Sequence, residues 1–183
     1  KGFSHWYNLD LPETIAVRKK LLCEEGEFSQ IAMSATDDWS GEINEKDCPV
    51  LVIIEGLTMY LEESDIKKIF SVINSTFEKA TVFVETMNPM IVKNFREKSI
   101  EKSNAKFKWG IKSGKMLAEL IPDFRFVEDR SAATVSAAAA RALFAGGGED
   151  AAMPTTTLSQ AENSFPSVKF SEKSRLSATF QIK

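Results

Sequence analysis

Pro49-Val50-Leu51-Val52-Ile53-Ile54-Glu55-Gly56 (residues 49–56) is the stretch of sequence that decides the fold. Its central residues, 50–54, form an unbroken apolar run rich in β-branched side chains, bounded by a proline and an acid-glycine pair. Such a run predicts a strand buried on both faces, as strands of a parallel sheet are. Downstream, apolar residues recur at helical spacing from 66 to 77 behind Ser64, a good N-cap, and predict an amphipathic helix.

Segments typical of strands and helices alternate on both sides of this stretch. Further strands are predicted at 6–10, 30–33, 81–85 and 124–127, and further helices at 13–23, 90–108 and 113–121. This alternation is typical of an α/β fold with a doubly wound, mostly parallel sheet. Residues 176–182 alternate apolar and polar side chains and predict a last strand, antiparallel and at an edge of the sheet.

The chain divides by composition into three parts. Residues 1–130 carry the alternating pattern and form the predicted α/β core. Residues 131–167 begin with an alanine-rich run that ends in three glycines and continue with a stretch rich in Thr, Ser and Pro, which predicts a helix and a flexible linker. Residues 168–183 contain the last strand and are expected to complete the sheet.

The composition excludes several classes of function. The 183 residues are 43% hydrophobic and 27% charged with a net charge of −3, so a core is possible and no overall basic field exists for coating nucleic acid. No apolar run approaches the ~20 residues that span a bilayer. One histidine, His5, and two cysteines without a CxxC pair exclude zinc fingers and histidine-rich metal centres. We expect a cytoplasmic protein with no metal and with Cys23 and Cys48 reduced, although one disulfide is arithmetically possible.

Three of the predicted strands end in an acidic residue: Asp10, Glu55 and Glu85. Open α/β sheets bind ligands outside the carboxyl ends of their strands. An acid after the second strand commonly accepts hydrogen bonds from a ribose diol, and an acid at a central strand can hold an ammonium group or act as a base. From position alone, Asp10 and Glu55 are as well explained by solvation of a loop, and Glu85 is expected to do only that.

Four strings of sequence carry a family resemblance. They are Trp6-Tyr-Asn-Leu-Asp-Leu-Pro-Glu13, Ile31-Ala-Met-Ser-Ala-Thr-Asp-Asp-Trp39, Ile54-Glu-Gly-Leu-Thr-Met-Tyr-Leu61 and Phe107-Lys-Trp-Gly-Ile-Lys-Ser-Gly114. In this order they resemble the leucine carboxyl methyltransferase family, and within it the bacterial and archaeal branch of tetracenomycin-type polyketide O-methyltransferases. The resemblance covers about residues 5–128. It implies a Rossmann-like class I methyltransferase fold and S-adenosylmethionine as the cofactor.

The resemblance also implies which residues bind the cofactor. Asp10 would bind its ribose, and Ser34 and Ala35 would contact its adenine. Ser34 departs from the eukaryotic leucine carboxyl enzymes, which carry Asp there. Glu55, followed by Gly56, would face the methionine end of the cofactor, where a carboxylate suits the ammonium group.

For the reaction itself, the resemblance implies that Tyr60 stands near the transferred methyl group, as a catalytic and substrate-binding residue. Trp109 and Lys112 would line the pocket of the acceptor, a small molecule with a hydroxyl or carboxyl group. Simpler explanations stay open for all three. Tyr60 would then be a packing residue at a strand-to-helix turn, and the other two would be surface side chains.

Two features depart from the family. Methyltransferases of this fold cradle the methionine end of the cofactor with a Gly-rich loop after the first strand, and no such loop precedes Asp10. A first strand normally lies in mid-sheet, so its absence would leave exposed hydrogen-bonding edges and a gap in the core. We therefore expect that an N-terminal segment or a partner chain, as in an oligomer, fills that place. Residues 131–165 do not resemble the family's substrate-side segment.

The sequence favours an S-adenosylmethionine-dependent O-methyltransferase, without a nucleic-acid partner and without a membrane span, over three alternatives. A degenerate, non-catalytic methyltransferase fold that pairs with another chain would also explain the missing Gly-rich loop. Six basic and three aromatic residues within 93–109 could bind single-stranded nucleic acid, although a solvated helix face explains them better. A nicotinamide-dependent dehydrogenase would need a GxGxxG pattern, which the sequence lacks.

Overall fold

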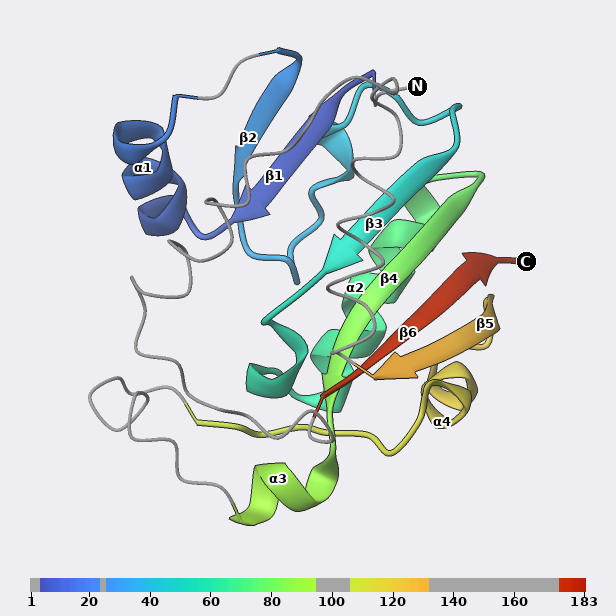
Figure 1. Cartoon of the computed structure of the whole chain (residues 1–183). Helices are drawn as coiled ribbons and strands as arrows, with labels where there is room; N and C mark the ends of the chain where they lie inside the picture. The colour runs from blue at the N-terminus through green and yellow to red at the C-terminus, as the bar shows by residue number, and fades with distance from the viewer. Residues whose placement is uncertain (1–3, 24–25, 95–105, 132–174) are drawn as a thin grey trace, which may run out of the picture.

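The computed structural model describes residues 4–23, 26–94, 106–131 and 175–183 (Figure 1). Within these ranges the secondary structure, in chain order, is β1 (Trp6–Asp10), α1 (Pro12–Leu21), β2 (Phe28–Ala32), the 3-10 turn η1 (Ser40–Glu42), β3 (Val50–Ile54), the 3-10 turn η2 (Thr58–Tyr60), α2 (Glu63–Thr76), β4 (Ala80–Met87), α3 (Pro89–Asn94), α4 (Gly114–Leu120), β5 (Phe124–Ser131) and β6 (Arg175–Ile182).

The described strands form two sheets rather than one. β1 and β2 pair in parallel, and the other four strands follow the order β3-β4-β6-β5, in which β3 and β4 are parallel and β6 is antiparallel to both of its neighbours. The predicted α/β fold with an antiparallel last strand is confirmed. The predicted position of this last strand at a sheet edge is wrong, because β6 pairs with β4 on one side and β5 on the other. Figure 1 shows the arrowheads of β1 and β3 pointing in the same direction, and β4 runs parallel to β3.

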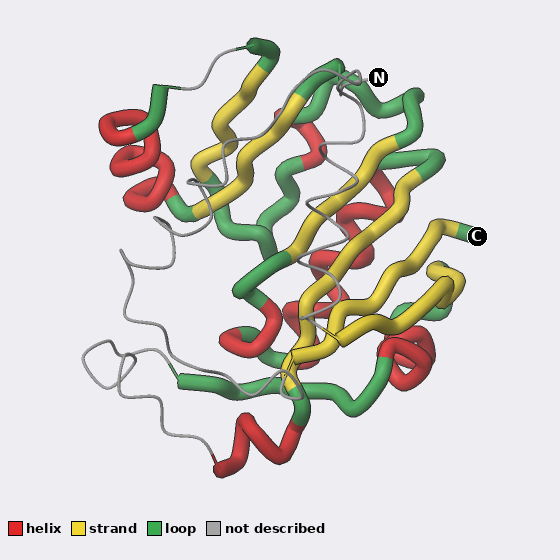
Figure 2. Tube along the Cα trace, viewed as in Figure 1, coloured by secondary structure: helices red, strands yellow, loops and turns green. Residues whose placement is uncertain are grey.

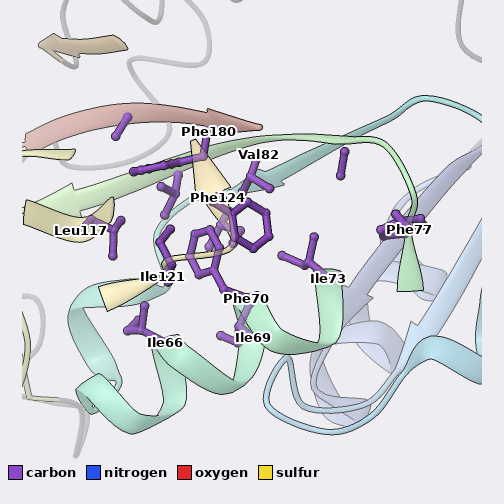
Figure 3. Packing of buried hydrophobic residues seen from close by; sticks show 14 of the residues in the cluster. Ile66, Ile69, Phe70, Ile73, Phe77, Val82, Leu117, Ile121, Phe124 and Phe180 are labelled. Atoms are coloured by element: carbon purple, nitrogen blue, oxygen red, sulfur yellow. The ribbon is translucent and has the colours of Figure 1, made fainter. Parts of the chain in front are cut away.

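Helix α2 packs its apolar side on one face of the four-stranded sheet (Figure 3). The buried side of α2 consists of residues at helical spacing: Ile66, Ile69, Phe70 and Ile73. Phe70 lies edge-on to Phe124 and Phe180, with ring centroids 5.0 Å and 6.1 Å apart. The predicted amphipathic helix is thus confirmed. Its N-cap is Glu62, which forms a capping box with Asp65, and not the expected Ser64.

The opposite face of β3 is open among the described residues. Leu51 and Ile53 are 59% and 41% exposed, whereas Ile54 is buried. The expectation that both faces of residues 50–54 are buried is therefore wrong. The reason is that β3 has a strand neighbour on one side only, and α2 covers one face.

The predicted helix at 90–108 is only partly present. α3 ends at Asn94, residues 95–105 lie outside the described part of the chain, and 106–112 are not helical. The helix predicted at 113–121 is confirmed as α4, where the Ser113 side chain caps the helix by accepting from the Met116 backbone N–H. β5 runs to Ser131 and so crosses the predicted boundary at 130. The alanine-rich helix and linker predicted at 131–167 otherwise lie outside the described residues.

The β1–β2 sheet joins the rest of the molecule through shared packing and one polar cluster. Trp39 and Ile43, in the connection from β2 to β3, belong to the same buried core as α2 and β4. The Tyr7 hydroxyl, on β1, donates a hydrogen bond to the Glu45 carboxylate and accepts one from the Asn44 backbone N–H. Burial and the Glu45 contact raise the pKa of Tyr7, and the same hydrogen bond lowers the pKa of Glu45.

Two further expectations concern the cysteines and a membrane span. Cys23 is exposed, Cys48 is half-buried, and neither is in a disulfide. Among the helices of the described residues, none combines the length and the apolar character needed to cross a bilayer.

Candidate functional site

The turn after β3 is built around Glu55 and Gly56. Gly56 has a φ of +66°, a backbone conformation that suits glycine because it has no Cβ. Its N–H donates to Oε2 of Glu85, at 2.9 Å, and the Thr58 hydroxyl donates to the Glu85 carbonyl, at 2.7 Å. These bonds leave the Glu55 side chain exposed at the carboxyl end of β3.

Glu85 does not solvate a loop, so that expectation is wrong. It lies near the end of β4 and is only 5% exposed. A buried carboxylate requires hydrogen-bond donors, and the Gly56 N–H is one of them. The sequence signal for this role was an acid at the end of an apolar central strand, opposite a glycine that follows the neighbouring strand.

Residues 106–113, the crossing loop, run past η2 and the end of β4 and include two of the three predicted acceptor residues, Trp109 and Lys112 (Figure 2). The backbone N–H groups of Lys108 and Trp109 donate to the Met59 carbonyl, at 2.8 Å and 3.3 Å, and Ile111 N–H donates to the Met87 carbonyl, at 2.8 Å. These bonds across to other elements replace the intrahelical bonds that a helix through 108 would need. At Gly110 a Cβ would lie 2.6 Å from the Met87 carbonyl oxygen, so only glycine fits this close crossing.

The three predicted acceptor residues differ in exposure. Tyr60 is half-buried, and its ring lies 5.4 Å, centroid to centroid, from the ring of Phe107. Trp109 is 9% exposed and is part of the core, so it is not the surface side chain of the simpler explanation. Lys112 is exposed. All three belong to η2 or to the crossing loop. Together with β3, these segments form one side of the sheet edge at which the strands end.

Asp10, Ser34 and Ala35 form the other side of the edge. Asp10 is the exposed last residue of β1, and its Oδ1 accepts from the Leu11 backbone N–H at 2.8 Å. The Asp10 carbonyl accepts from Met33 N–H at 3.1 Å, which places the turn after β2 beside the end of β1. Ser34 and Ala35 are half-buried in that turn.

The side chain of Ser34 is used within its own turn. Its Oγ lies 2.9 Å from the Thr36 hydroxyl and accepts from the Thr36 N–H at 3.2 Å. The Asp37 carboxylate accepts from the Ser34 N–H at 3.1 Å. The turn therefore has a fixed shape, and a ligand would meet the side of the turn rather than a free serine hydroxyl.

The structure thus brings the predicted residues to one edge as two groups. Asp10, Ser34 and Ala35 come from the β1–β2 sheet, and Glu55, Gly56 and Tyr60 come from the β3 side. The two exposed carboxylates, Asp10 and Glu55, suit a ligand with a diol at one end and an ammonium group at the other, because both of these groups donate hydrogen bonds. The described residues supply no glycine-rich turn between the two groups.

The comparisons with known proteins agree with this architecture. The chain is similar to a curated protein, the tetracenomycin polyketide synthesis O-methyltransferase TcmP of Streptomyces glaucescens, with 28% identity over 128 residues. These residues are 69% of this chain and 47% of TcmP, so the chain spans about half the length of the relative that it matches. No protein-family model matches the chain.

Solved structures give the same result for the fold. An S-adenosylmethionine-dependent methyltransferase from Mesorhizobium loti matches with a TM-score of 0.54 and 12% identity, over 98% of this chain and 81% of that one. The chain has the fold of class I methyltransferases. A Thermobifida fusca protein described as a methyltransferase matches with a TM-score of 0.59 and 12% identity, over 98% and 63% of the two chains. The glycopeptide N-methyltransferase MtfA matches with a TM-score of 0.50 and 11% identity, over 97% and 72%.

The methyltransferase fold and the similarity to TcmP fit the family resemblance of the four sequence strings. The fold gives meaning to the edge described above, because open α/β sheets bind ligands at the carboxyl ends of their parallel strands. The individual roles of Asp10, Ser34, Ala35, Glu55, Tyr60, Trp109 and Lys112 stay predictions.

Proposed function

We propose that this chain forms part of an S-adenosylmethionine-dependent O-methyltransferase that methylates a hydroxyl or carboxyl group of a small, polyketide-like molecule. The observation that carries the proposal is the pair of exposed carboxylates, Asp10 and Glu55, at one edge of a methyltransferase fold. The similarity to an O-methyltransferase of polyketide synthesis supports the choice of acceptor class.

The cofactor would lie along this edge. Asp10 would accept hydrogen bonds from its ribose hydroxyls, and the fixed turn at Ser34 and Ala35 would pack against its adenine. Glu55, held out by the Gly56 turn, would pair with the ammonium group of its methionine end. MtfA, which has this fold, has been solved in complex with S-adenosylmethionine, and this supports the choice of cofactor.

Methyl transfer asks little of the side chains, because the sulfonium of the bound cofactor already activates the methyl group. The protein has to align the acceptor oxygen with that methyl group and exclude water. Tyr60 would do this, and its half-buried position in η2, with its ring near that of Phe107, supports this role. Lys112 would add a cation at the entrance of the acceptor pocket. The buried Trp109 would line the inner side of that pocket.

The acceptor atom is the part of the proposal that most needs a direct assay, because MtfA shares the fold and methylates nitrogen. A panel of phenols, carboxylates and amines, assayed for methyl transfer, separates the two chemistries. We expect turnover with the oxygen acceptors. Turnover with amines alone would overturn O-methylation and keep the methyltransferase assignment.

We also propose that an additional strand, from an N-terminal segment or a partner chain, completes the sheet between β1 and β3. Among the described strands, β3 has a neighbour on one side only, and no hydrogen-bonded ladder joins it to β1 or β2. The same observation favours a second candidate function, a non-catalytic module that pairs with another chain. Such a module would bind its partner and not the cofactor.

Two cysteines outside any disulfide support a cytoplasmic location.

The proposal is tested by titrating the chain with S-adenosylhomocysteine, the product form of the cofactor, in a calorimeter. We expect one-site binding, weakened about tenfold or more in Asp10→Ala and in Glu55→Ala, because each removes a charged hydrogen-bond acceptor. Asp123→Ala is the matched control: it removes an exposed acid just before β5, at the opposite edge, and should leave the affinity unchanged. Unchanged binding in both site variants would overturn the proposal, and no binding by the folded wild-type chain would favour the module.

A further inference from the structure

Glu85 is a buried acid that hydrogen-bonds to the turn that carries Glu55. It lies on β4, between β3 and β6 in the sheet, and is 5% exposed. Its Oε2 accepts from the Gly56 N–H at 2.9 Å, and its carbonyl accepts from the Thr58 hydroxyl at 2.7 Å. Thr58 itself is 1% exposed. Two different groups of one residue therefore hold two points of the turn that follows β3.

This arrangement fixes a backbone conformation that is otherwise easy to lose. Gly56 is at a φ of +66°, and nothing lies within 4 Å of the place where a Cβ would be, so packing does not hold it. Glycine has more backbone freedom than any other residue. A charged acceptor makes a stronger hydrogen bond to a backbone N–H than a neutral one. Because packing does not hold Gly56, the hydrogen bond to the Glu85 carboxylate is what constrains its backbone conformation.

We propose that Glu85 is a positioning residue for the cofactor: its buried carboxylate sets the Gly56 turn and so aims the Glu55 carboxylate at the ammonium group. The role of Glu55 in this statement rests on the proposed function. The effect of Glu85 on the turn does not, and it can be measured without any ligand.

Two substitutions separate the hydrogen bond from the space that the side chain fills. Glu85→Gln keeps an oxygen that can accept from the Gly56 N–H, and Glu85→Met has a similar length and no such acceptor. Thr76→Val is the matched control for general destabilisation. It removes another partly buried hydrogen bond, from Thr76 Oγ1 to the Val72 carbonyl at 2.6 Å, in the last turn of α2 and away from Gly56.

The first measurement is hydrogen exchange of the Gly56 amide in the free chain, followed by NMR. We expect exchange at Gly56 to be about tenfold or more faster in Glu85→Met, with little change in Glu85→Gln and none in Thr76→Val. Amides of the core strand β4, such as that of Val82, serve as the internal reference. Equal exchange at Gly56 in wild type and Glu85→Met would overturn the proposal.

The second measurement is the affinity for S-adenosylhomocysteine under conditions where every variant is folded. We expect Glu85→Met to bind about tenfold or more weakly, Glu85→Gln within about threefold of wild type, and Thr76→Val like wild type. Faster Gly56 exchange with unchanged affinity would overturn the role in cofactor binding. A wild-type chain that does not bind would overturn the proposed function and this role with it, whereas the exchange result still decides what Glu85 does to the turn.

Discussion

The four-stranded sheet and the β1–β2 sheet each present a carboxylate at the same edge, but they hold it differently. On the β3 side, the turn that carries Glu55 is tied to the buried Glu85, and the adjacent β4 has residues that are fully buried. On the other side, Asp10 ends a strand in which no residue is buried; those from Trp6 to Leu9 are half-buried and Asp10 is exposed.

This difference follows from what each sheet can cover. β4 has strands on both sides and α2 on one face, so Val82 and Val84 are at 0% exposure. A sheet of only two strands is marginal by itself. β1 and β2 depend on the packing of Ile31, Trp39 and Ile43 into the common core. One half of the candidate site is therefore built into a self-supporting sheet, and the other half depends on its neighbours.

The largest expected effect distinguishes a buried residue of the four-stranded sheet from a half-buried residue of the β1–β2 sheet. Phe180→Ala removes a ring at 0% exposure that lies 6.1 Å from Phe70 and 5.9 Å from Phe126, centroid to centroid. We expect a loss of about 3–5 kcal/mol in the free energy of unfolding. Leu9→Ala, at a half-buried position of β1, should cost about 1 kcal/mol. Denaturant unfolding measures both, and equal losses would contradict the contrast between the sheets.

A smaller effect concerns the polar link between the sheets. The hydrogen bond from Tyr7 lowers the pKa of Glu45 below the ordinary value of a glutamate, so the folded state favours the carboxylate. The stabilisation is complete above that value and is lost as the pH falls through the folded-state pKa. Tyr7→Phe should therefore lower Tm slightly at neutral pH, and the difference from wild type should shrink in acid.

The check on this prediction is Tm against pH for the two proteins. Because the Glu45 side chain is still 40% exposed, solvent screens its charge and the effect is small. A difference in Tm that stays constant down to strongly acidic pH would mean that the Tyr7 hydroxyl acts through the Asn44 backbone N–H, which does not titrate, rather than through Glu45.

The sequence predicted the elements whose signal is local. The apolar run at 50–54, the helical spacing from 66 to 77 and the helix at 113–121 each match an element of the structure. The sequence did not predict which face of a strand is covered. The exposure of Leu51 depends on which other elements pack against β3. The sequence prediction also extended a helix through Lys108, whose N–H instead bonds to the Met59 carbonyl, a partner far away in the chain.

The same limit applies to the candidate site. Acids at strand ends were visible, and the structure brings Asp10 and Glu55 to one edge. The different use of Glu85 was missed, since recognising it requires knowing that β3 pairs with β4 and so brings Gly56 next to Glu85. Likewise, the sequence left open whether Trp109 lines the acceptor pocket or lies at the surface, and only the structure shows that it belongs to the core.

The most direct test of the central claim, that two separate sheets hold one cofactor, is an NMR titration of backbone amides with S-adenosylhomocysteine. The account predicts that amides at the end of β1, around Leu11, and in the turn at Gly56 shift together and give the same Kd. Shifts at only one of these places, at two different affinities, or at neither in a folded chain would contradict it.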